Sequence, residues 1–348
     1  MYSTTLMASD PPEKFSKEAE KVGFVWVDPA PELLSGEVKT LAEKNNVAAE
    51  KTSGFWYGPR GFRWQVWRTG TCGTKRSSII SMVRGGFVMG TAHPSNGSMT
   101  TLANGLLEHF PANTRLFALE YRLSSHEPFA VANPFPAALL DALAGYKYLV
   151  ESLRYDPKNI IIGGDSAGGT LAFWLARYLA ISNLPNLPNA GGLLLLSPTV
   201  DWANTYTDRE SSMHKHSSTD FVYTILICGY TLRALMGNLP LPDAPSNVWI
   251  APGSKQNDAP GLFTGLPKTV IVAGGAEQTL DAMVVLRDRL ERDLGKDNVK
   301  YIEKPDATHD YLTASWHEPE RTETLVELGE WANDRIWSTC LNTTDFSS

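Results

Sequence analysis

Hydrophobic residues along the chain gather in short runs that are separated by longer amphipathic segments. The three consecutive isoleucines at residues 160–162 suit a strand that is buried on both faces. In all, eight strands are predicted, at residues 55–57, 62–67, 78–83, 116–121, 160–162, 193–196, 269–272 and 299–303. Apolar residues at helical spacing predict helices over residues 136–151, 170–181 and 282–294. This alternation indicates an α/β fold with a mainly parallel eight-stranded sheet and helices on both faces.

Two segments fall outside this alternation and are interpreted as covers over the core. Residues 1–53 are polar, include a predicted helix at residues 32–50, and form the expected N-terminal cap segment. Residues 201–245 form the expected cap insertion. The apolar run of this insertion, residues 221–236, is shorter than the roughly 20 residues of a membrane span and predicts a cap helix. The core is then assigned to residues 54–200 and 246–340.

Composition narrows the possible partners and the compartment. Of the 348 residues, 43% are hydrophobic and 20% are charged, and the net charge is −7. This charge argues against a nucleic acid or an anionic membrane as the main partner. Cys72, Cys228 and Cys340 are widely scattered, which favours a reducing compartment, and no basic segment followed by an apolar one opens the chain. We therefore expect a cytoplasmic protein.

A GxSxG motif, formed by Gly164, Ser166 and Gly168, follows the isoleucine strand and precedes the helix at residues 170–181. In a sharp turn from strand to helix, such glycines permit close packing while the serine hydroxyl is presented outward. The amide of Ala167, at the helix start, points to where a carbonyl oxygen would gain negative charge. Because no GxGxxG or GxxxxGK[ST] motif is present here, a nucleophilic serine is favoured over a phosphate-binding loop.

A serine becomes nucleophilic at neutral pH when a histidine, itself oriented by a carboxylate, accepts its proton. His309 lies on the loop after the last predicted strand, at the sheet edge where Ser166 is expected. After the strand at residues 269–272, Glu277 lies in the loop and Asp281 begins the next helix. Glu277 is the preferred acid, since Asp281 suits a helix N-cap or a first-turn charge. Asp281 stays the alternative.

The other histidines give no sign of a metal site. His214 and His216 lack a third ligand, and His317 lacks the second histidine of a zinc protease motif. The histidines before the serine suit surface or structural positions. We therefore expect neither a metal nor a cofactor.

These motifs together resemble those of the hormone-sensitive-lipase-like α/β-hydrolases, with the fungal esterase and steryl acetyl hydrolase branch as the nearest comparison. The resemblance runs from about residue 78 to residue 316. Besides the GxSxG turn, it depends on the glycine loop at residues 84–90, on residues 121–141, and on the loops that carry Glu277 and His309. It implies an α/β-hydrolase fold with a helical cap and the activity of a serine esterase.

The resemblance also implies a role for particular residues. Ser166 corresponds to the nucleophile, His309 to the base, and Glu277 to the first acid of the family's DPLxD pattern. The oxyanion hole corresponds to the amides of Gly85, Gly86 and Ala167.

The chain departs from the family pattern at the entry to the glycine loop. Val83 and Arg84 stand where the family has a histidine and the first glycine, which adds a cation beside the oxyanion amides. With this replacement, a biosynthetic enzyme that catalyses acyl transfer, condensation or cyclisation remains an alternative to a hydrolase. Whether water or another molecule accepts the acyl group depends on how well the pocket excludes water. A non-catalytic ligand receptor is the remaining alternative, and the presence of His309 disfavours it.

The leading hypothesis is a carboxylic ester hydrolase that cleaves short-acyl, acetyl-type esters of an apolar small molecule or secondary metabolite. Phe87 and Trp202, with Phe221 and Tyr223, are expected either to line an aromatic entrance or to pack in the cap core. The expected partner is a small-molecule ester, with no nucleic acid and no membrane span, and a homodimer is compatible with the sequence.

Overall fold

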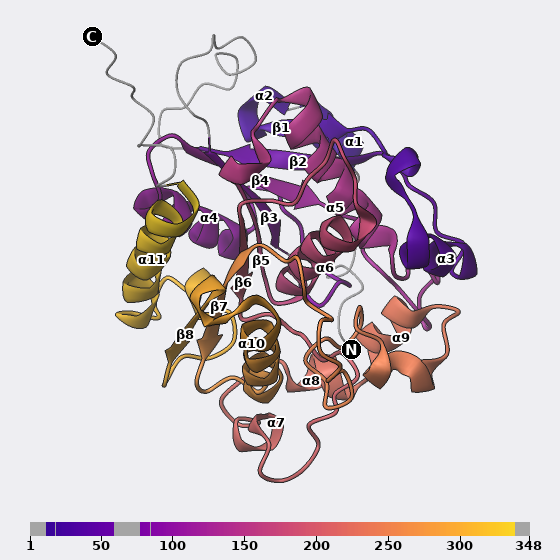
Figure 1. The fold of residues 1–348 in the computed structure, drawn as a ribbon, viewed down its shortest axis with the longest axis vertical. Helices are drawn as coiled ribbons and strands as arrows, with labels where there is room; N and C mark the ends of the chain where they lie inside the picture. The colour runs from indigo at the N-terminus through magenta and orange to yellow at the C-terminus, as the bar shows by residue number, and fades with distance from the viewer. Residues whose placement is uncertain (1–11, 18, 59–76, 84, 338–348) are drawn as a thin grey trace.

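The computed structural model describes residues 12–17, 19–58, 77–83 and 85–337, and its centre is an eight-stranded sheet (Figure 1). The strand order is β1-β2-β4-β3-β5-β6-β7-β8, in which β2 pairs antiparallel with β1 and β4 and the other neighbours pair parallel. The strands are β1 (Phe24–Val27), β2 (Thr52–Tyr57), β3 (Ser77–Val83), β4 (Thr114–Glu120), β5 (Ile160–Asp165), β6 (Gly192–Leu196), β7 (Lys268–Gly274) and β8 (Val299–Lys304). The predicted fold class is confirmed.

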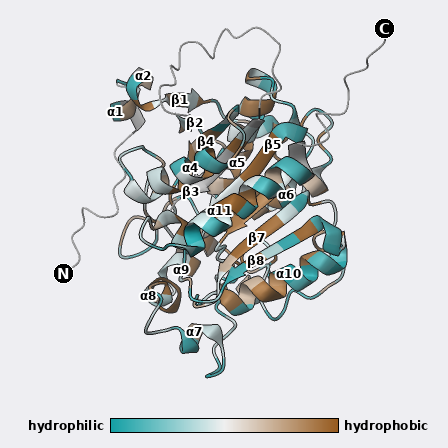
Figure 2. Ribbon diagram, turned by 90° about the vertical axis from the view of Figure 1, so that its left-hand side faces the viewer, coloured by the Kyte–Doolittle hydropathy of each residue, from teal (hydrophilic) through white to brown (hydrophobic). Residues whose placement is uncertain are grey.

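Helices cover both faces of the sheet (Figure 1). The long ones are α4 (Gly97–His109), α5 (Ala137–Lys147), α6 (Ala167–Ser182), α10 (Leu280–Leu294) and α11 (Glu320–Trp331). On one face, apolar residues of α4 and α11 share a buried cluster with Ile161 of β5. On the other, residues of α5, α6 and α10 share a cluster with Ile160 and Ile162. Neighbouring residues of β5 thus enter opposite cores, as the isoleucine run predicts, and Figure 2 shows β5 as a hydrophobic strand at the centre of the sheet.

The N-terminal segment differs from the prediction, because it contributes a strand to the sheet. β1 pairs with β2 at the sheet edge and buries Phe24 and Val27. Two short helices precede it, α1 (Pro12–Ser16) and α2 (Ala19–Val22). The helix predicted over residues 32–50 is shorter, with a 3₁₀ turn at Pro31–Leu33 followed by α3 (Gly36–Lys44). The strand predicted at residues 62–67 lies outside the described residues.

The segment between β6 and β7 forms short helices rather than the single long cap helix predicted over residues 221–236. These are α7 (Ser212–Lys215), α8 (Tyr223–Ile227) and α9 (Tyr230–Met236). Gly229 adopts a φ of +63° between α8 and α9, a left-handed conformation that ends one helix and starts the next. In the part of the chain that is described, no helix has the length and hydrophobicity needed to cross a membrane.

The parallel strands determine where the predicted site residues lie. Gly85, Ser166, Glu277 and His309 follow β3, β5, β7 and β8. Because these strands run in the same direction, the four residues lie at one edge of the sheet, where ligands bind in such folds.

Candidate active site

Ser166 occupies a tight turn between β5 and α6 and has a φ of +52°, a strained value for a residue with a side chain. The turn is held on both sides, because the Ser166 amide donates to the Leu196 carbonyl (2.9 Å) and its carbonyl accepts from the Thr199 amide (3.1 Å). The helix start packs closely, since a Cβ on Gly169 would lie 2.8 Å from the Cβ of Pro198. This packing leaves the serine partly exposed at the strand end.

His309 lies beside Ser166, as the sequence predicts. The distance from His309 Nε2 to Ser166 Oγ is 2.8 Å, and that from His309 Nδ1 to Glu277 Oε2 is 2.9 Å. Because a carboxylate only accepts hydrogen bonds, Nδ1 carries the imidazole proton and Nε2 can accept the proton of the serine. The three side chains therefore form a continuous hydrogen-bonded row.

Glu277 is fully buried, and four donors surround its carboxylate. Oε1 accepts from the Gly274 amide (2.6 Å) and the Ser197 hydroxyl (2.6 Å), and Oε2 accepts from the Thr279 hydroxyl (3.1 Å) as well as from His309. Donors on both oxygens stabilise the ionised form and orient it toward the imidazole. Ser197 and Thr279 were not predicted as site residues.

Asp281, the alternative acid, has a different environment. It lies in the first turn of α10, its carboxylate accepts from the Ser212 amide (2.9 Å), and its own amide donates to the Ser212 hydroxyl (3.1 Å). The structure thus places Glu277, and not Asp281, against His309.

Three neighbouring acids, Asp310, Glu277 and Asp220, change the pKa of His309. Burial by itself disfavours the imidazolium, but the carboxylates of Asp310 and Glu277 raise the pKa of His309 above its ordinary value. Burial raises the pKa of Asp220, and the nearby charge of His309 partly offsets this rise. The site therefore favours a positive charge on the imidazole, as it must when the imidazole takes a proton from serine.

The glycine loop after β3 lies next to the serine turn, because β3 and β5 are neighbours in the sheet. Gly86 has a φ of +57°, and the amides of Val88 and Met89 donate to the Gly85 carbonyl at 3.2 and 3.1 Å. Within the described part of the chain, the amides of Gly85, Gly86 and Ala167 have no protein acceptor. Arg84, predicted to alter this loop, lies outside the described residues.

Phe87 and Trp202 lie in the core. This corrects the interpretation that they line an aromatic entrance. Phe87 is completely buried and stacks on Trp174, with ring centroids 4.8 Å apart, and Trp202 contacts Phe87 edge-on at 5.6 Å. The exposed aromatic beside the site is Phe221, whose ring lies 5.5 Å from that of His309 and whose surface is 63% exposed.

Gln278 attaches the segment between β6 and β7 to the site. It is buried, its amide donates to Asp220 Oδ2 (2.8 Å), and its side-chain oxygen accepts from the Tyr223 amide (2.8 Å). Because Gln278 directly follows Glu277, the segment that carries Phe221 is held against the loop that carries the acid.

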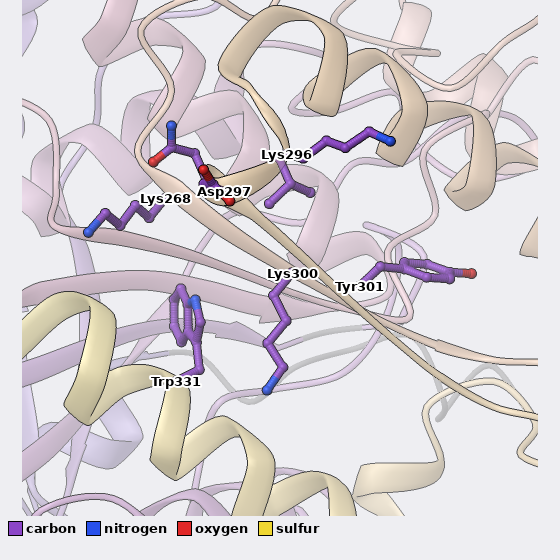
Figure 3. A pocket seen from close by; sticks show the side chains of 8 residues that line it. Lys268, Lys296, Asp297, Lys300, Tyr301 and Trp331 are labelled. Carbon is purple, nitrogen blue, oxygen red and sulfur yellow. The ribbon is translucent and has the colours of Figure 1, made fainter.

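No cluster of three metal-binding side chains occurs among the described residues. A cavity of about 340 Å³ does occur, but it is lined by Lys268, Lys296, Lys300, Trp331 and neighbours near the starts of β7 and β8 (Figure 3). The starts of parallel strands lie at the sheet edge opposite Ser166, so this cavity is separate from the candidate active site.

Comparisons with known proteins agree with this geometry. A family model described as alpha/beta hydrolase fold matches residues 84–313. The esterase LipU of Mycobacterium tuberculosis is 26% identical over 262 residues, which are 75% of this chain and 79% of that protein. An acetyl-hydrolase of Streptomyces hygroscopicus is 31% identical over 166 residues, 48% of each chain.

Solved structures show the same fold. The structure of EstE5-PMSF has a TM-score of 0.62 at 20% identity and covers 94% of this chain and 92% of its own. An esterase from the bacterial hormone-sensitive lipase family has a TM-score of 0.58 at 22% identity over 82% of each chain. The chain belongs to the alpha/beta-hydrolase family. Within this family, it is a serine hydrolase of the carboxylesterase type.

Proposed function

We propose that the chain hydrolyses short-acyl esters of an apolar small molecule or secondary metabolite through an acyl-enzyme formed on Ser166. The observation that supports this most is the row of hydrogen bonds from Ser166 through His309 to Glu277, with distances of 2.8 and 2.9 Å. A serine, a histidine and a carboxylate in this order are the groups that nucleophilic acyl transfer requires.

In the proposed reaction, Ser166 Oγ attacks the ester carbonyl while its proton moves to His309 Nε2. The amides of Gly85, Gly86 and Ala167 would hold the oxyanion that forms, since they have no other protein acceptor within the described part of the chain. The imidazolium, stabilised by Glu277, then gives its proton to the leaving alcohol, and the acyl group stays on Ser166. Water, activated by the same imidazole, attacks the acyl-enzyme, returns a proton to Ser166 and releases the acid.

The substrate class rests on two further observations. An acetyl-hydrolase is among the relatives, which supports a short acyl group. The exposed ring of Phe221 beside His309 supports an apolar alcohol. Residues 201–245 would then act as a cap that bears this contact. A position near the fungal esterase and steryl acetyl hydrolase branch stays a prediction, as does a homodimer.

Labelling with a fluorophosphonate, followed by a series of p-nitrophenyl esters of increasing acyl length, tests the proposal. We expect labelling of the wild type and none of Ser166→Ala, with kcat/KM falling at least about tenfold from acetate or butyrate to decanoate, a difference of about 1.4 kcal/mol. Equal rates across the series would contradict the short-acyl assignment. Labelling that persists in Ser166→Ala would contradict the mechanism.

A further inference from the structure

The Nε2 atom of His309 has two oxygen neighbours. Ser166 Oγ lies at 2.8 Å, and Oδ2 of Asp310 lies at 3.4 Å. The second distance is that of a close ion pair rather than of a short hydrogen bond. The mechanism proposed above gives Asp310 no role, although its carboxylate contacts the atom that must accept the serine proton.

The backbone fixes Asp310 in this position. Its φ of +57° is left-handed, which aspartate tolerates better than most residues. The Asp310 amide donates to the Ser197 hydroxyl (3.2 Å), which in turn donates to Glu277 (2.6 Å). The Asp310 carbonyl accepts from the amide and the hydroxyl of Thr313, both at 2.8 Å. The carboxylate is therefore held at the site by the same network that holds the triad acid.

The other acids that face His309 are arranged differently. Glu277 reaches Nδ1 and is satisfied by its own donors. Asp220, from the segment between β6 and β7, accepts from the amides of Phe221 and Gln278 at 2.8 Å each. Asp165 is buried at the end of β5. Among the described residues, only Asp310 offers a carboxylate oxygen within 4 Å of Nε2.

These charges oppose one another in a confined space. Burial raises the pKa of Asp310 to about 7, with Glu277 and Asp220 adding to the shift and His309 counteracting it. Burial and the charge of Asp310 raise the pKa of Asp165 well above its ordinary value. The negative charge of Asp310 in turn favours a proton on His309 and so raises the pKa of its imidazole.

This inference rests on the proposed esterase mechanism. We propose that Asp310 is a positioning residue whose carboxylate, through its ion pair with His309, holds a proton on Nε2, so that loss of this proton activates Ser166. While Nε2 carries this proton, the imidazole cannot accept the proton of Ser166. Once it is lost, Nε2 accepts the serine proton during attack, and the Asp310 carboxylate stabilises the imidazolium until that proton passes to the leaving alcohol.

The test is the pH dependence of inactivation by a fluorophosphonate, a rate that reports the reactivity of Ser166 without a hydrolysis step. In the wild type, the rate should rise with pH as the proton on His309 Nε2 is lost. Asp310→Asn removes the negative charge, lowers the pKa of His309, and should move the midpoint to lower pH by about one unit or more. Asp310→Glu, which keeps a carboxylate, should return the midpoint toward the wild-type value.

Two further variants complete the experiment. Asp306→Asn removes the same charge from an exposed position in the same loop and should leave the midpoint unchanged. Asp310→Gly suits the left-handed backbone and should shift the midpoint as Asp310→Asn does, even if Asp310→Asn folds poorly. Labelled Ser166 with an unmoved midpoint in both Asp310→Asn and Asp310→Gly would overturn the role of Asp310. Absence of labelling in the wild type would instead contradict the esterase mechanism.

Discussion

The two regions that meet at the site, the loops after β7 and β8 and the segment between β6 and β7, are built in different ways. The loops are packed so closely that a Cβ on Gly274 would lie 2.2 Å from the Ala307 carbonyl oxygen. The segment consists of short helices and exposes apolar side chains, including Phe221 and Ile227. The triad candidates Glu277 and His309 lie in the first region, and Phe221, the exposed apolar residue beside His309, lies in the second.

From this difference we infer that the loops serve catalysis and the segment serves substrate selection. Catalysis requires reacting atoms to be held to within fractions of an ångström, which close packing and satisfied hydrogen bonds provide. Substrate choice requires an apolar surface that remains accessible. Substitutions in the loops should therefore reduce the rate with all esters, and those in the segment should change which esters are preferred.

The largest effect is expected at the acid. Glu277→Gln should lower kcat/KM by roughly 10³- to 10⁴-fold, because an amide cannot hold the imidazole in the same tautomer. It should also cost about 1–3 kcal/mol of stability, since an NH₂ group would face donors. Asp281→Asn, the matched control, should mainly cost about 1 kcal/mol of stability, because it removes a first-turn charge that also accepts from the Ser212 amide. Measurements of kcat/KM and of melting curves for both variants distinguish the two acids. A large loss of kcat/KM in Asp281→Asn and a small one in Glu277→Gln would assign the triad acid to Asp281.

A smaller effect is expected from packing alone. Gly274→Ala should push the loops after β7 and β8 apart, lowering stability by about 1–3 kcal/mol and kcat/KM by about 100-fold on every ester. Gly97→Ala serves as the control, because nothing lies within 4 Å of the added Cβ and alanine favours the start of α4. A Gly274→Ala enzyme with unchanged rates would show that the close packing is not needed.

The smallest effect is expected at Phe221. Phe221→Ala should lower kcat/KM by about tenfold, or about 1.4 kcal/mol, for acetates of bulky apolar alcohols. Ethyl acetate, whose short alcohol offers little apolar surface to the ring, should be hydrolysed nearly as before, and stability should not change. Trp316→Ala, at a residue that is 77% exposed on the loop after His309, is the control. An equal loss of kcat/KM on both substrates would show that Phe221 supports the structure of the site and does not select the alcohol.

The sequence alone predicted the parts of the molecule that depend on local pattern. The isoleucine strand could be recognised because each of its residues is buried, and Ser166 because its turn has glycines on both sides. Glu277 and His309 could be placed because they follow strands of a parallel sheet. Helix α4 was missed, although Asn96 caps it by accepting from the amides of Ser98 and Met99, a signal present in the sequence.

Other features depend on contacts between distant residues and have no local signal. β1 spans four residues and becomes a strand through its pairing with β2. Phe87 could not be assigned to core or entrance from its neighbours in sequence, because its ring stacks on Trp174 of the distant helix α6. Likewise, Asp310 reaches His309 Nε2 only because its backbone is left-handed and bonded to Ser197.

The central claim is that Ser166 carries the acyl group, and the most direct measurement is the mass of the enzyme trapped during turnover of p-nitrophenyl acetate. Acid quenching in the first turnovers should give a protein heavier by one acetyl group, located on the peptide that contains Ser166, together with a burst of p-nitrophenol. Ser166→Ala should show neither and should lose activity on the order of 10³-fold or more. An acetyl group on another residue, or a burst that survives in Ser166→Ala, would contradict the account.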